Sequence, residues 1–301
     1  MRVVVTGGAG FIGSNLVDAL LARGDDVVVV DDLSSGKREN VAAEARVVEH
    51  DIRLPGLVEL FAEVRPEVCF HIAAQADVPT SVRRPDFDAE VNVVGTVHVL
   101  QAAGTATDVV FSSTGGAIYG DVERPAREDD PRLPLSPYGV AKLAGEEYLA
   151  GWNRLYGTRH TTLRFANVYG PRQETGLEGG VVAIFLNAMA AGEETTIYGD
   201  GGQTRDFVHV DDVVRGLVAA PGHGGVLNIG SGQETSVLQL HERCGAVSGD
   251  GRPPVYAPPR EGDLRRSVLD VSRAAQELGW RPEVSLDEGL RRTWDWIGSR
   301  G

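Results

Sequence analysis

Three glycines spaced three residues apart, directly after a short apolar run, constrain the fold of this chain more than any other feature. Residues 2–6 are rich in valine, which is typical of a buried parallel strand. Gly7, Gly10 and Gly13 follow at once, and residues 14–23 have the leucine spacing of an amphipathic helix. Glycines at such a turn let the backbone approach a pyrophosphate, whose charge is stabilised by the helix N-terminus. The pattern predicts a dinucleotide-binding βαβ unit in an α/β fold with a Rossmann-type, doubly wound parallel sheet.

The second strand of this unit supports the same interpretation. Residues 27–30 form another valine run, which ends at Asp31 and Asp32. An acid at this point can accept hydrogen bonds from the ribose hydroxyls of an adenosine, and it repels a 2′-phosphate. We therefore expect NAD rather than NADP, although Lys37 and Arg38 follow closely and weaken the electrostatic preference.

Later strand ends bring small or polar residues to the edge of the sheet where ligands of such folds bind. Residues 47–50 predict a third strand, and Asp51 after it is either an adenine contact or the cap of a turn. Residues 68–72 predict a fourth strand, which ends in small side chains. The long helix predicted over residues 85–103 contains Asn92, which can bond to a strand end facing the cofactor instead of to solvent.

A fifth predicted strand ends in three hydroxyl residues, Ser112, Ser113 and Thr114. Hydroxyls at this edge can hydrogen-bond a substrate or relay its proton, but they are also common in turns. We expect residues 115–120 to make a flexible turn and residues 121–134 to form a polar loop that can lie over the site.

A tyrosine and a lysine, four residues apart, begin the next predicted helix, which runs to about residue 156. Tyr138 and Lys142 share one helical face. An ammonium beside a phenol favours the phenolate and lowers the phenol pKa, so such a tyrosine can act as a general base near neutral pH. The same spacing is common in ordinary amphipathic helices, and the surrounding NAD-binding pattern is what favours the catalytic interpretation.

Charge and apolar content limit the classes of partner. The 301 residues carry a formal net charge of −14, which argues against binding to nucleic acid or to an anionic membrane. No apolar run reaches the roughly 18–20 residues that span a membrane. The N-terminus has no signal-peptide pattern, so we expect a cytoplasmic enzyme. The two cysteines give neither a disulfide framework nor a metal pattern.

Together these blocks resemble the extended short-chain dehydrogenase/reductase family, and within it the UDP-glucose (UDP-galactose) 4-epimerases. The resemblance covers nearly the whole chain and includes two later blocks, residues 205–212 and residues 260–263. It implies an NAD-binding Rossmann domain over residues 1–168 and a smaller mixed α/β substrate lobe over residues 169–301. It also implies that residues 206–230 return in part to the first domain, and that the protein is a homodimer.

The resemblance assigns roles to particular residues. Tyr138 is the catalytic base, Lys142 anchors the nicotinamide ribose and lowers the pKa of the tyrosine, and Thr114 is the third active-site member, with Ser113 as the alternative. The implied NAD contacts are Gly7, Gly10, Phe11, Ile12, Gly13, Asp31, Asp32, Asp51, Ile52, Ile72, Ala73, Ala74, Gln75, Asn92, Ser112, Tyr138 and Lys142. The implied contacts to the UDP-sugar are Asn167, Val181, Tyr198, Arg205, Arg260 and Asp263.

The reaction that the resemblance implies is 4-epimerisation of a UDP-hexose, through a transient 4-keto sugar and with NAD held throughout. Ser267 matches a position that lines the sugar pocket, and its small side chain would also admit UDP-N-acetylglucosamine; UDP-glucuronate is a further alternative. Related dehydratases and decarboxylases carry an acid in the turn after the hydroxyl residue, and residues 114–117 contain none. A non-catalytic NAD-binding sensor is disfavoured because Tyr138 and Lys142 are both present.

Overall fold

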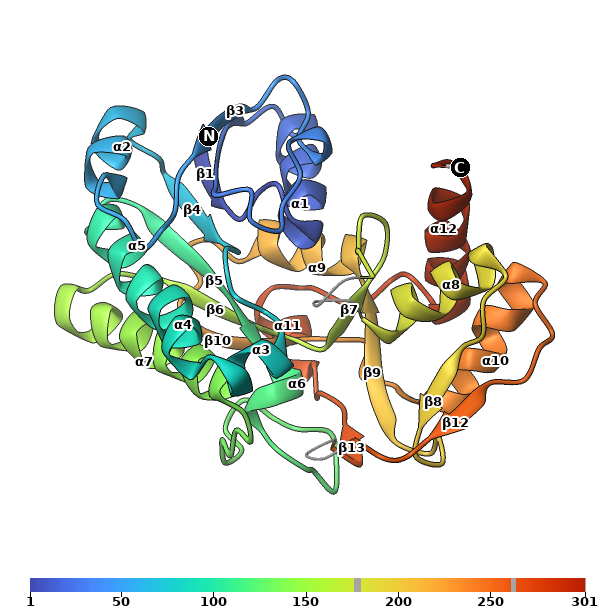
Figure 1. The fold of residues 1–301 in the computed structure, drawn as a ribbon. Coiled ribbons are helices and arrows are strands. Elements are labelled where there is room, and N and C mark those ends of the chain that lie inside the picture. The colour runs from blue at the N-terminus through green and yellow to red at the C-terminus, as the bar shows by residue number, and fades with distance from the viewer. Residues whose placement is uncertain (176–179, 261–263, 301) are drawn as a thin grey trace.

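The computed structural model describes residues 1–175, 180–260 and 264–300. These residues form a seven-stranded sheet of order β3-β2-β1-β4-β5-β6-β10, in which every neighbouring pair is parallel (Figure 1). Its strands are β1 (Arg2–Thr6), β2 (Asp26–Asp31), β3 (Arg46–Glu49), β4 (Val68–His71), β5 (Asp108–Thr114), β6 (Thr161–Phe165) and β10 (Gly225–Ile229). The predicted α/β fold with a doubly wound sheet is confirmed. The strand order reverses between β1 and β4, and ligands of such sheets bind in the crevice at that point.

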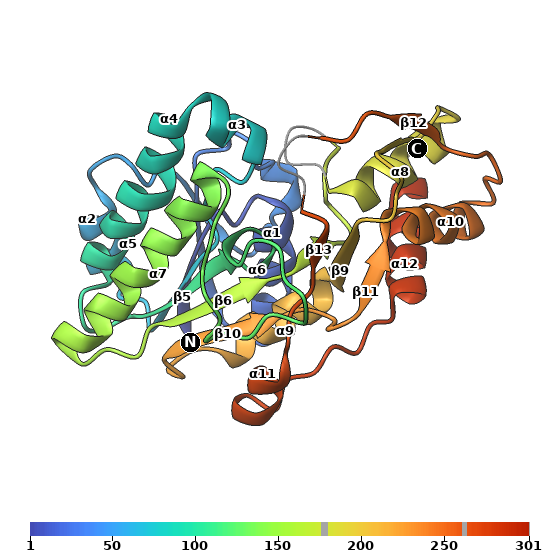
Figure 2. The same cartoon turned by 90° about the horizontal axis from the view of Figure 1, so that it is seen from below.

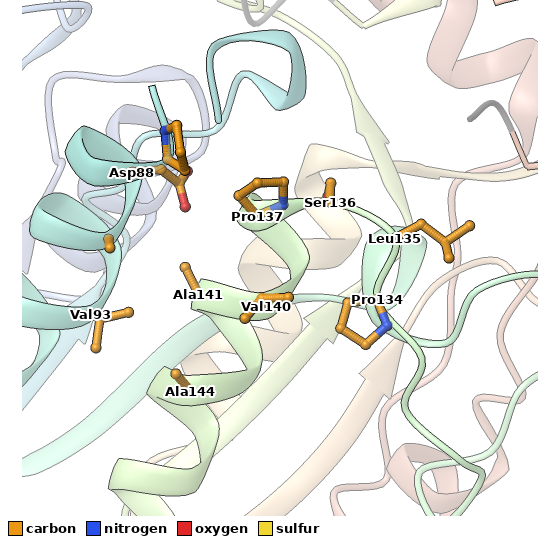
Figure 3. A pocket seen from close by; sticks show the side chains of 11 residues that line it. Asp88, Val93, Pro134, Leu135, Ser136, Pro137, Val140, Ala141 and Ala144 are labelled. Carbon is orange, nitrogen blue, oxygen red and sulfur yellow. The ribbon is translucent and has the colours of Figure 1, made fainter. Parts of the chain in front are cut away.

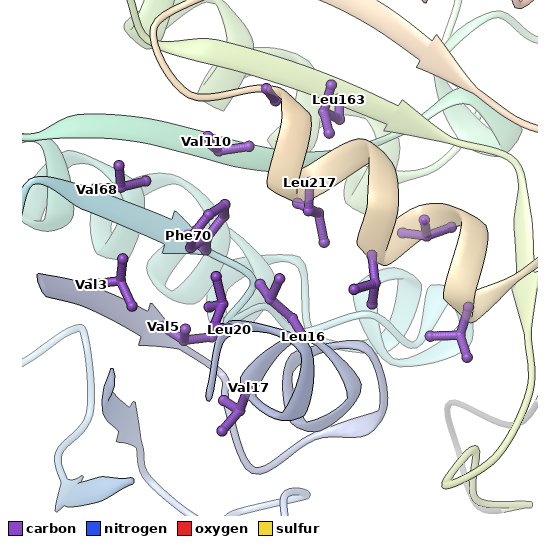
Figure 4. Packing of buried hydrophobic residues seen from close by; sticks show 14 of the residues in the cluster. Val3, Val5, Leu16, Val17, Leu20, Val68, Phe70, Val110, Leu163 and Leu217 are labelled. Carbon is purple, nitrogen blue, oxygen red and sulfur yellow. The ribbon is translucent and has the colours of Figure 1, made fainter. Parts of the chain in front are cut away.

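Two apolar clusters cover the two faces of this sheet. The first contains Val3 and Val5 of β1 and packs against α1 (Phe11–Ala22) and α9 (Val210–Ala219), as Figure 4 shows for Leu16 and Leu217. The second contains Val4 and packs against α2 (Leu57–Val64), α5 (Gly95–Ala103) and α7 (Pro137–Tyr156). Successive strand residues point to opposite faces, so a continuous valine run supplies both clusters.

The predicted helix over residues 85–103 contains a local change of winding. It consists of α4 (Pro85–Ala89), a π-helical turn η2 (Glu90–Val94) and α5, and α3 (Val78–Arg83) precedes it. Single π-helical turns inside helices are frequent at functional sites. This turn carries Asn92, whose side chain is buried.

The expectation of a flexible turn over residues 115–120 is wrong. Residues Gly115–Ile118 form the short helix α6, and Ile118 and Tyr119 are buried. The Tyr119 hydroxyl accepts a hydrogen bond from Arg164 of β6 at 2.6 Å and donates one to Asn228 of β10 at 2.8 Å. These two bonds attach the end of α6 to the large sheet. Residues 121–134 are irregular, as predicted, apart from single bonds such as that from Ala126 N to the Val268 carbonyl at 2.9 Å.

A second group of elements lies beyond the ends of β5 and β6 (Figures 1 and 2). Helices α8 (Val181–Ala191), α10 (Val237–Ser248) and α12 (Leu286–Gly298) enclose a third apolar cluster. The remaining elements are η1 (Arg38–Asn40), β7 (Asn167–Tyr169), β8 (Thr196–Tyr198), β9 (Thr204–His209), β11 (Glu234–Ser236), β12 (Val255–Ala257), β13 (Arg266–Ser267) and α11 (Ser272–Glu277). Strand β9 belongs to a small sheet with β7, β11 and β13, whereas α9 packs on α1 and β10 pairs with β6. The domain boundaries predicted from the sequence stay a prediction. Within the described residues no helix is both long and apolar enough to cross a membrane.

Candidate active site

The glycine turn after β1 leaves room in front of helix α1. Gly7 has φ +71°, and a Cβ there would lie 2.6 Å from the amide nitrogen of Ala73. A Cβ at Gly13 would lie 2.0 Å from the Gly7 carbonyl oxygen, so glycine is required for the turn to pack on the helix. At Gly10 a Cβ would meet only the Gly7 carbonyl, at 3.4 Å, and the space beyond is open. Because Gly10 has no side chain to cap α1, the amides at this helix end remain suited to an anion.

Asp31 closes the other side of this turn. Its carboxylate accepts hydrogen bonds from the backbone amides of Ala9 and Leu33, each at 2.9 Å. Burial raises the pKa of Asp31, and the two amide bonds oppose that shift. Lys37, which weakened the sequence-based preference for NAD, forms an ion pair with Glu174 at 2.8 Å. Lys37 is thus paired with a carboxylate of its own, and the contact of Asp31 with a ribose stays a prediction.

Asp32 and Asp51 both make turns at strand ends. Asp32 accepts bonds from the amide and the hydroxyl of Ser34. Asp51 accepts a bond from the Arg53 amide at 2.8 Å and pairs with the Arg53 guanidinium, which holds the pKa of Asp51 below its usual value. The turn-cap interpretation of Asp51 is thus observed, while its contact with adenine stays a prediction. Ile52 is buried beneath it.

The end of β4 is held by Asn92, which is one of the two alternatives that the sequence left open for this side chain. The Gln75 amide donates to Asn92 Oδ1 at 3.0 Å, and Asn92 Nδ2 donates to the Gln75 carbonyl at 2.8 Å. Below them His71 is bonded to the hydroxyls of Thr6 at 2.7 Å and Thr96 at 3.0 Å. Burial, assisted by the charge of Lys142, lowers the pKa of His71 to about 3, so its imidazole is neutral. The residues between His71 and Gln75 in the chain are partly buried, and they are Ile72, Ala73 and Ala74.

Helix α7 begins where the sequence predicts and carries Lys142 to the end of β5. Ser136 caps the helix by accepting a bond from the Gly139 amide at 3.2 Å. Lys142 Nζ donates to the Ser112 carbonyl at 2.9 Å and lies 4.9 Å from the centroid of the Phe111 ring. The lysine side chain is only 2% exposed, and this burial lowers the pKa of its ammonium to about 8.

The three hydroxyl residues at the end of β5 have different surroundings. Ser112 donates to the His71 carbonyl at 3.0 Å, and Ser113 donates to the Glu146 carboxylate at 2.5 Å. Both serine residues are buried, and each hydroxyl already donates its hydrogen bond to a group of the protein. Thr114, one residue later, is partly exposed, as is Tyr138. This difference favours Thr114 over Ser113 as the hydroxyl that meets a substrate.

A buried ion pair beneath the site was missed by the sequence reasoning. Arg164 in β6 pairs with Glu146 in α7 at 2.6 Å, with side chains 1% and 2% exposed. Glu146 follows Lys142 by four residues, so Tyr138, Lys142 and Glu146 share one helical face. That spacing, together with a lone arginine in the apolar run of residues 161–165, is the signal that could have revealed the pair.

The predicted substrate contacts form two groups. The Arg260 guanidinium stacks over the Tyr198 ring at 4.0 Å, and Arg205 lies beside the buried Ser267 because β9 and β13 pair in that register. In the other group, a Cβ added at Gly116 would lie 3.8 Å from both Asn167 Oδ1 and Thr114 Oγ1, which places these two side chains around one point. The partly buried Val181 begins α8, between the two groups in the chain. Asp263 lies outside the described residues.

The chain and its fold agree with a known family. The model of the NAD dependent epimerase/dehydratase family matches residues 3–230. This chain belongs to that family. Within the NAD dependent epimerase/dehydratase family it is similar to the UDP-glucose 4-epimerase of Mycolicibacterium smegmatis, with 50% identity over 97% of each chain.

Two solved structures extend the comparison to three dimensions. The UDP-glucose 4-epimerase of Thermotoga maritima, solved with UDP-glucose, is 47% identical, with a TM-score of 0.97 over 100% of this chain and 99% of that chain. The UDP-glucose 4-epimerase of Thermus thermophilus, solved with NAD, is 42% identical, with a TM-score of 0.94 over the whole of both chains. The cofactor in the family name fits this site, because the open space before α1 suits a pyrophosphate and Asp31 suits a ribose.

Proposed function

We propose that this protein is a UDP-hexose 4-epimerase that interconverts UDP-glucose and UDP-galactose with tightly bound NAD. The observation that carries the proposal is the bond from Lys142 Nζ to the Ser112 carbonyl at 2.9 Å. It holds an ammonium one helical turn from Tyr138 and beside the strand end that carries Thr114. The relatives named UDP-glucose 4-epimerase, at 42–50% identity over nearly the full chain, support the same reaction.

The work of the protein groups is proton transfer and orientation. When bound by the glycine turn and Asp31, NAD would supply the reversible hydride chemistry at C4 of the sugar. Tyr138 takes the proton of the sugar 4-hydroxyl and later gives it back. The ammonium of Lys142 favours the phenolate form of Tyr138 electrostatically, and the Thr114 hydroxyl hydrogen-bonds the same sugar oxygen. Ser113 keeps the end of β5 in place through Glu146.

Different elements hold the two ligands. The glycine turn and the N-terminus of α1 would bind the pyrophosphate of NAD, and Asp31 its adenosine ribose. Arg205 and Arg260 would bind the phosphates of UDP, because a guanidinium fork matches phosphate oxygens bidentately. Tyr198, beneath Arg260, offers an aromatic face to the uracil. Asn167 and Val181 would line the sugar side, and the role of Asp263 stays a prediction.

A panel of UDP-sugars tests the reaction. The purified protein is incubated separately with UDP-glucose, UDP-N-acetylglucosamine and UDP-glucuronate, and products are read by NMR for inversion at C4 and by mass spectrometry. We expect UDP-glucose to give UDP-galactose with unchanged mass, since residues 115–117 in α6 offer no carboxylate for elimination. A product that has lost water or carbon dioxide would contradict the proposal.

A homodimer is the second part of the proposal. Helix α7 exposes Val140, Tyr148 and Leu155 on its outer face, and a cavity of about 520 Å³ lies between this helix and α4 (Figure 3). An apolar face of this kind is typical of a protein interface. Gel filtration should give twice the chain mass, and Val140→Glu should shift the elution to the monomer. A wild-type protein that elutes as a monomer would contradict this part.

A further inference from the structure

Asp88 is a buried carboxylate for which the reaction has no use so far. It lies in α4, one helical turn before Asn92, and is 1% exposed. Its Oδ1 accepts bonds from Gln75 Nε2 at 2.7 Å and from Asn92 Nδ2 at 3.0 Å. Its Oδ2 is buried and has no hydrogen-bond partner within the described part of the chain. Figure 3 shows the carboxylate at the wall of the cavity that faces Pro137 and Ala141 of α7.

The hydrogen bonds of Asp88 fix the chain that leaves β4. Asp88 orients the side chains of Gln75 and Asn92, and Asn92 in turn binds both backbone groups of Gln75. The Gln75 side chain also closes a turn with Asp77, by accepting from the Asp77 amide at 2.7 Å and donating to its carbonyl at 3.1 Å. Two residues upstream, Ala73 packs against Gly7 of the glycine turn. Loss of Asp88 should therefore loosen one wall of the NAD crevice.

The charge of Asp88 bears on Lys142. The titratable groups that face this lysine are His71 from β4, Asp88 from α4, and Tyr138 and Glu146 from its own helix. His71 is neutral, and Glu146 is already paired with Arg164. Within the described residues Asp88 forms no ion pair with Lys142 or with any other cation, but the charge of Lys142 opposes the effect of burial on the Asp88 pKa. Asp88 is thus the negative charge left to balance the buried ammonium.

We propose that Asp88 is a positioning residue with two effects: it ties the strand end at residues 73–77 against the NAD crevice, and from the cavity wall that faces α7 it supplies a negative charge toward the buried Lys142. In this role Asp88 acts through Gln75, Asn92 and Lys142. The inference rests on the proposed roles of Tyr138 and Lys142. A buried carboxylate oxygen without a hydrogen-bond partner lowers the stability of the fold. The effect of its negative charge on Lys142 would explain why the protein has a carboxylate at this position.

The variant Asp88→Asn tests the charge alone, because an amide oxygen can still accept both hydrogen bonds. Without the carboxylate the pKa of Lys142 should fall further, so the alkaline decline of kcat should move to lower pH by about one unit, a tenfold change in the ammonium-to-amine ratio. KM for UDP-glucose and the NAD content should not change. Asp86→Asn is the matched control, since Asp86 is exposed and pairs with Arg84 in the same helix. A pH profile identical to that of the wild type would overturn this part.

The variant Asp88→Ala tests the positioning effect, because it also removes both hydrogen bonds. In the NAD-free protein, amide hydrogen exchange at residues 73–77 should be at least tenfold faster than in Asp88→Asn. Gln75→Met keeps the Asp88 charge and removes the Gln75 bond to Asp88 together with the two bonds to the Asp77 backbone. It should accelerate the same amides, those of residues 73–76 being the informative ones because the Asp77 amide loses its acceptor directly, and it covers the outcome in which Asp88→Ala does not fold. Exchange equal to that of the wild type in these variants would overturn the positioning effect. This readout needs no turnover, so a wild type that fails to epimerise UDP-glucose refutes the proposed function and leaves the exchange test intact.

Discussion

Removing the charge of Glu146 should destabilise the protein far more than removing that of its neighbour Glu147. Glu146 forms the buried pair with Arg164 at 2.6 Å and accepts a further bond from Ser113. Glu146→Gln preserves the shape of the side chain and leaves the Arg164 guanidinium buried without a counter-charge. Breaking a buried pair in this way costs about 3–5 kcal/mol.

The expected change in melting temperature follows from the size of the chain. Unfolding entropy is about 2.1 cal/mol/K per residue, so 301 residues give about 0.6 kcal/mol/K. The Glu146→Gln variant should therefore melt about 5–8 °C below the wild type. Glu147 pairs with Arg132 at 2.6 Å on the exposed side of the helix, and such pairs contribute only about 0–1 kcal/mol. Glu147→Gln should lower the melting temperature by less than about 2 °C.

Differential scanning calorimetry of both variants, loaded equally with NAD, measures this contrast. A double variant, Glu146→Leu with Arg164→Met, removes both charges and should regain much of the lost stability, because apolar residues can replace a buried pair at little cost. Equal melting shifts for the two glutamate variants would refute the assignment of Glu146 to a buried pair. A double variant no more stable than Glu146→Gln would refute the explanation by an unpaired charge.

Two further predictions concern the site itself. Because burial lowers the pKa of Lys142 to about 8 and the ammonium form is the active one, kcat should decline as the pH rises through about 8; a rate that stays constant to pH 9.5 would contradict this. Gly13→Ala places a methyl group 2.0 Å from the Gly7 carbonyl, so the purified variant should lose its bound NAD and about 1–3 kcal/mol of stability. Gly151→Ala in α7, where a Cβ meets nothing within 4 Å, is the control and should keep NAD and be as stable as the wild type or slightly more stable.

The sequence predicted those elements whose signals are local. The helix that carries Tyr138 was expected to run to about residue 156, and α7 ends at Tyr156 and begins after the cap Ser136 and its following proline. This helix has its own cap and side-chain spacing, which need no information about distant segments. By contrast, β11, β12 and β13 have only two or three residues, and their hydrogen bonds go to strands that are remote in sequence. No local pattern distinguishes them from loops.

The same distinction holds for the candidate site: features within one element could be predicted, and contacts between remote elements could not. Residues that one helix places on the same face, such as Tyr138 and Lys142 of α7, are visible as a spacing. The bond of Asn92 to the end of β4 was one of two alternatives, because the sequence alone does not tell whether a polar side chain inside a helix faces solvent or a strand end. The Ser113–Glu146–Arg164 chain joins β5, α7 and β6, and only the packing of these elements brings it together. The helical form of residues 115–118 likewise depends on the buried environment of Ile118 and Tyr119.

The most direct measurement follows UDP-galactose by proton NMR, with purified wild type and Tyr138→Phe and no added cofactor. The two proteins are first checked for equal content of NAD released on denaturation. We predict that the wild type forms UDP-glucose, and that Tyr138→Phe retains NAD but shows no turnover. Unimpaired conversion by Tyr138→Phe, or a wild type that remains inactive even when NAD is supplied, would contradict the account.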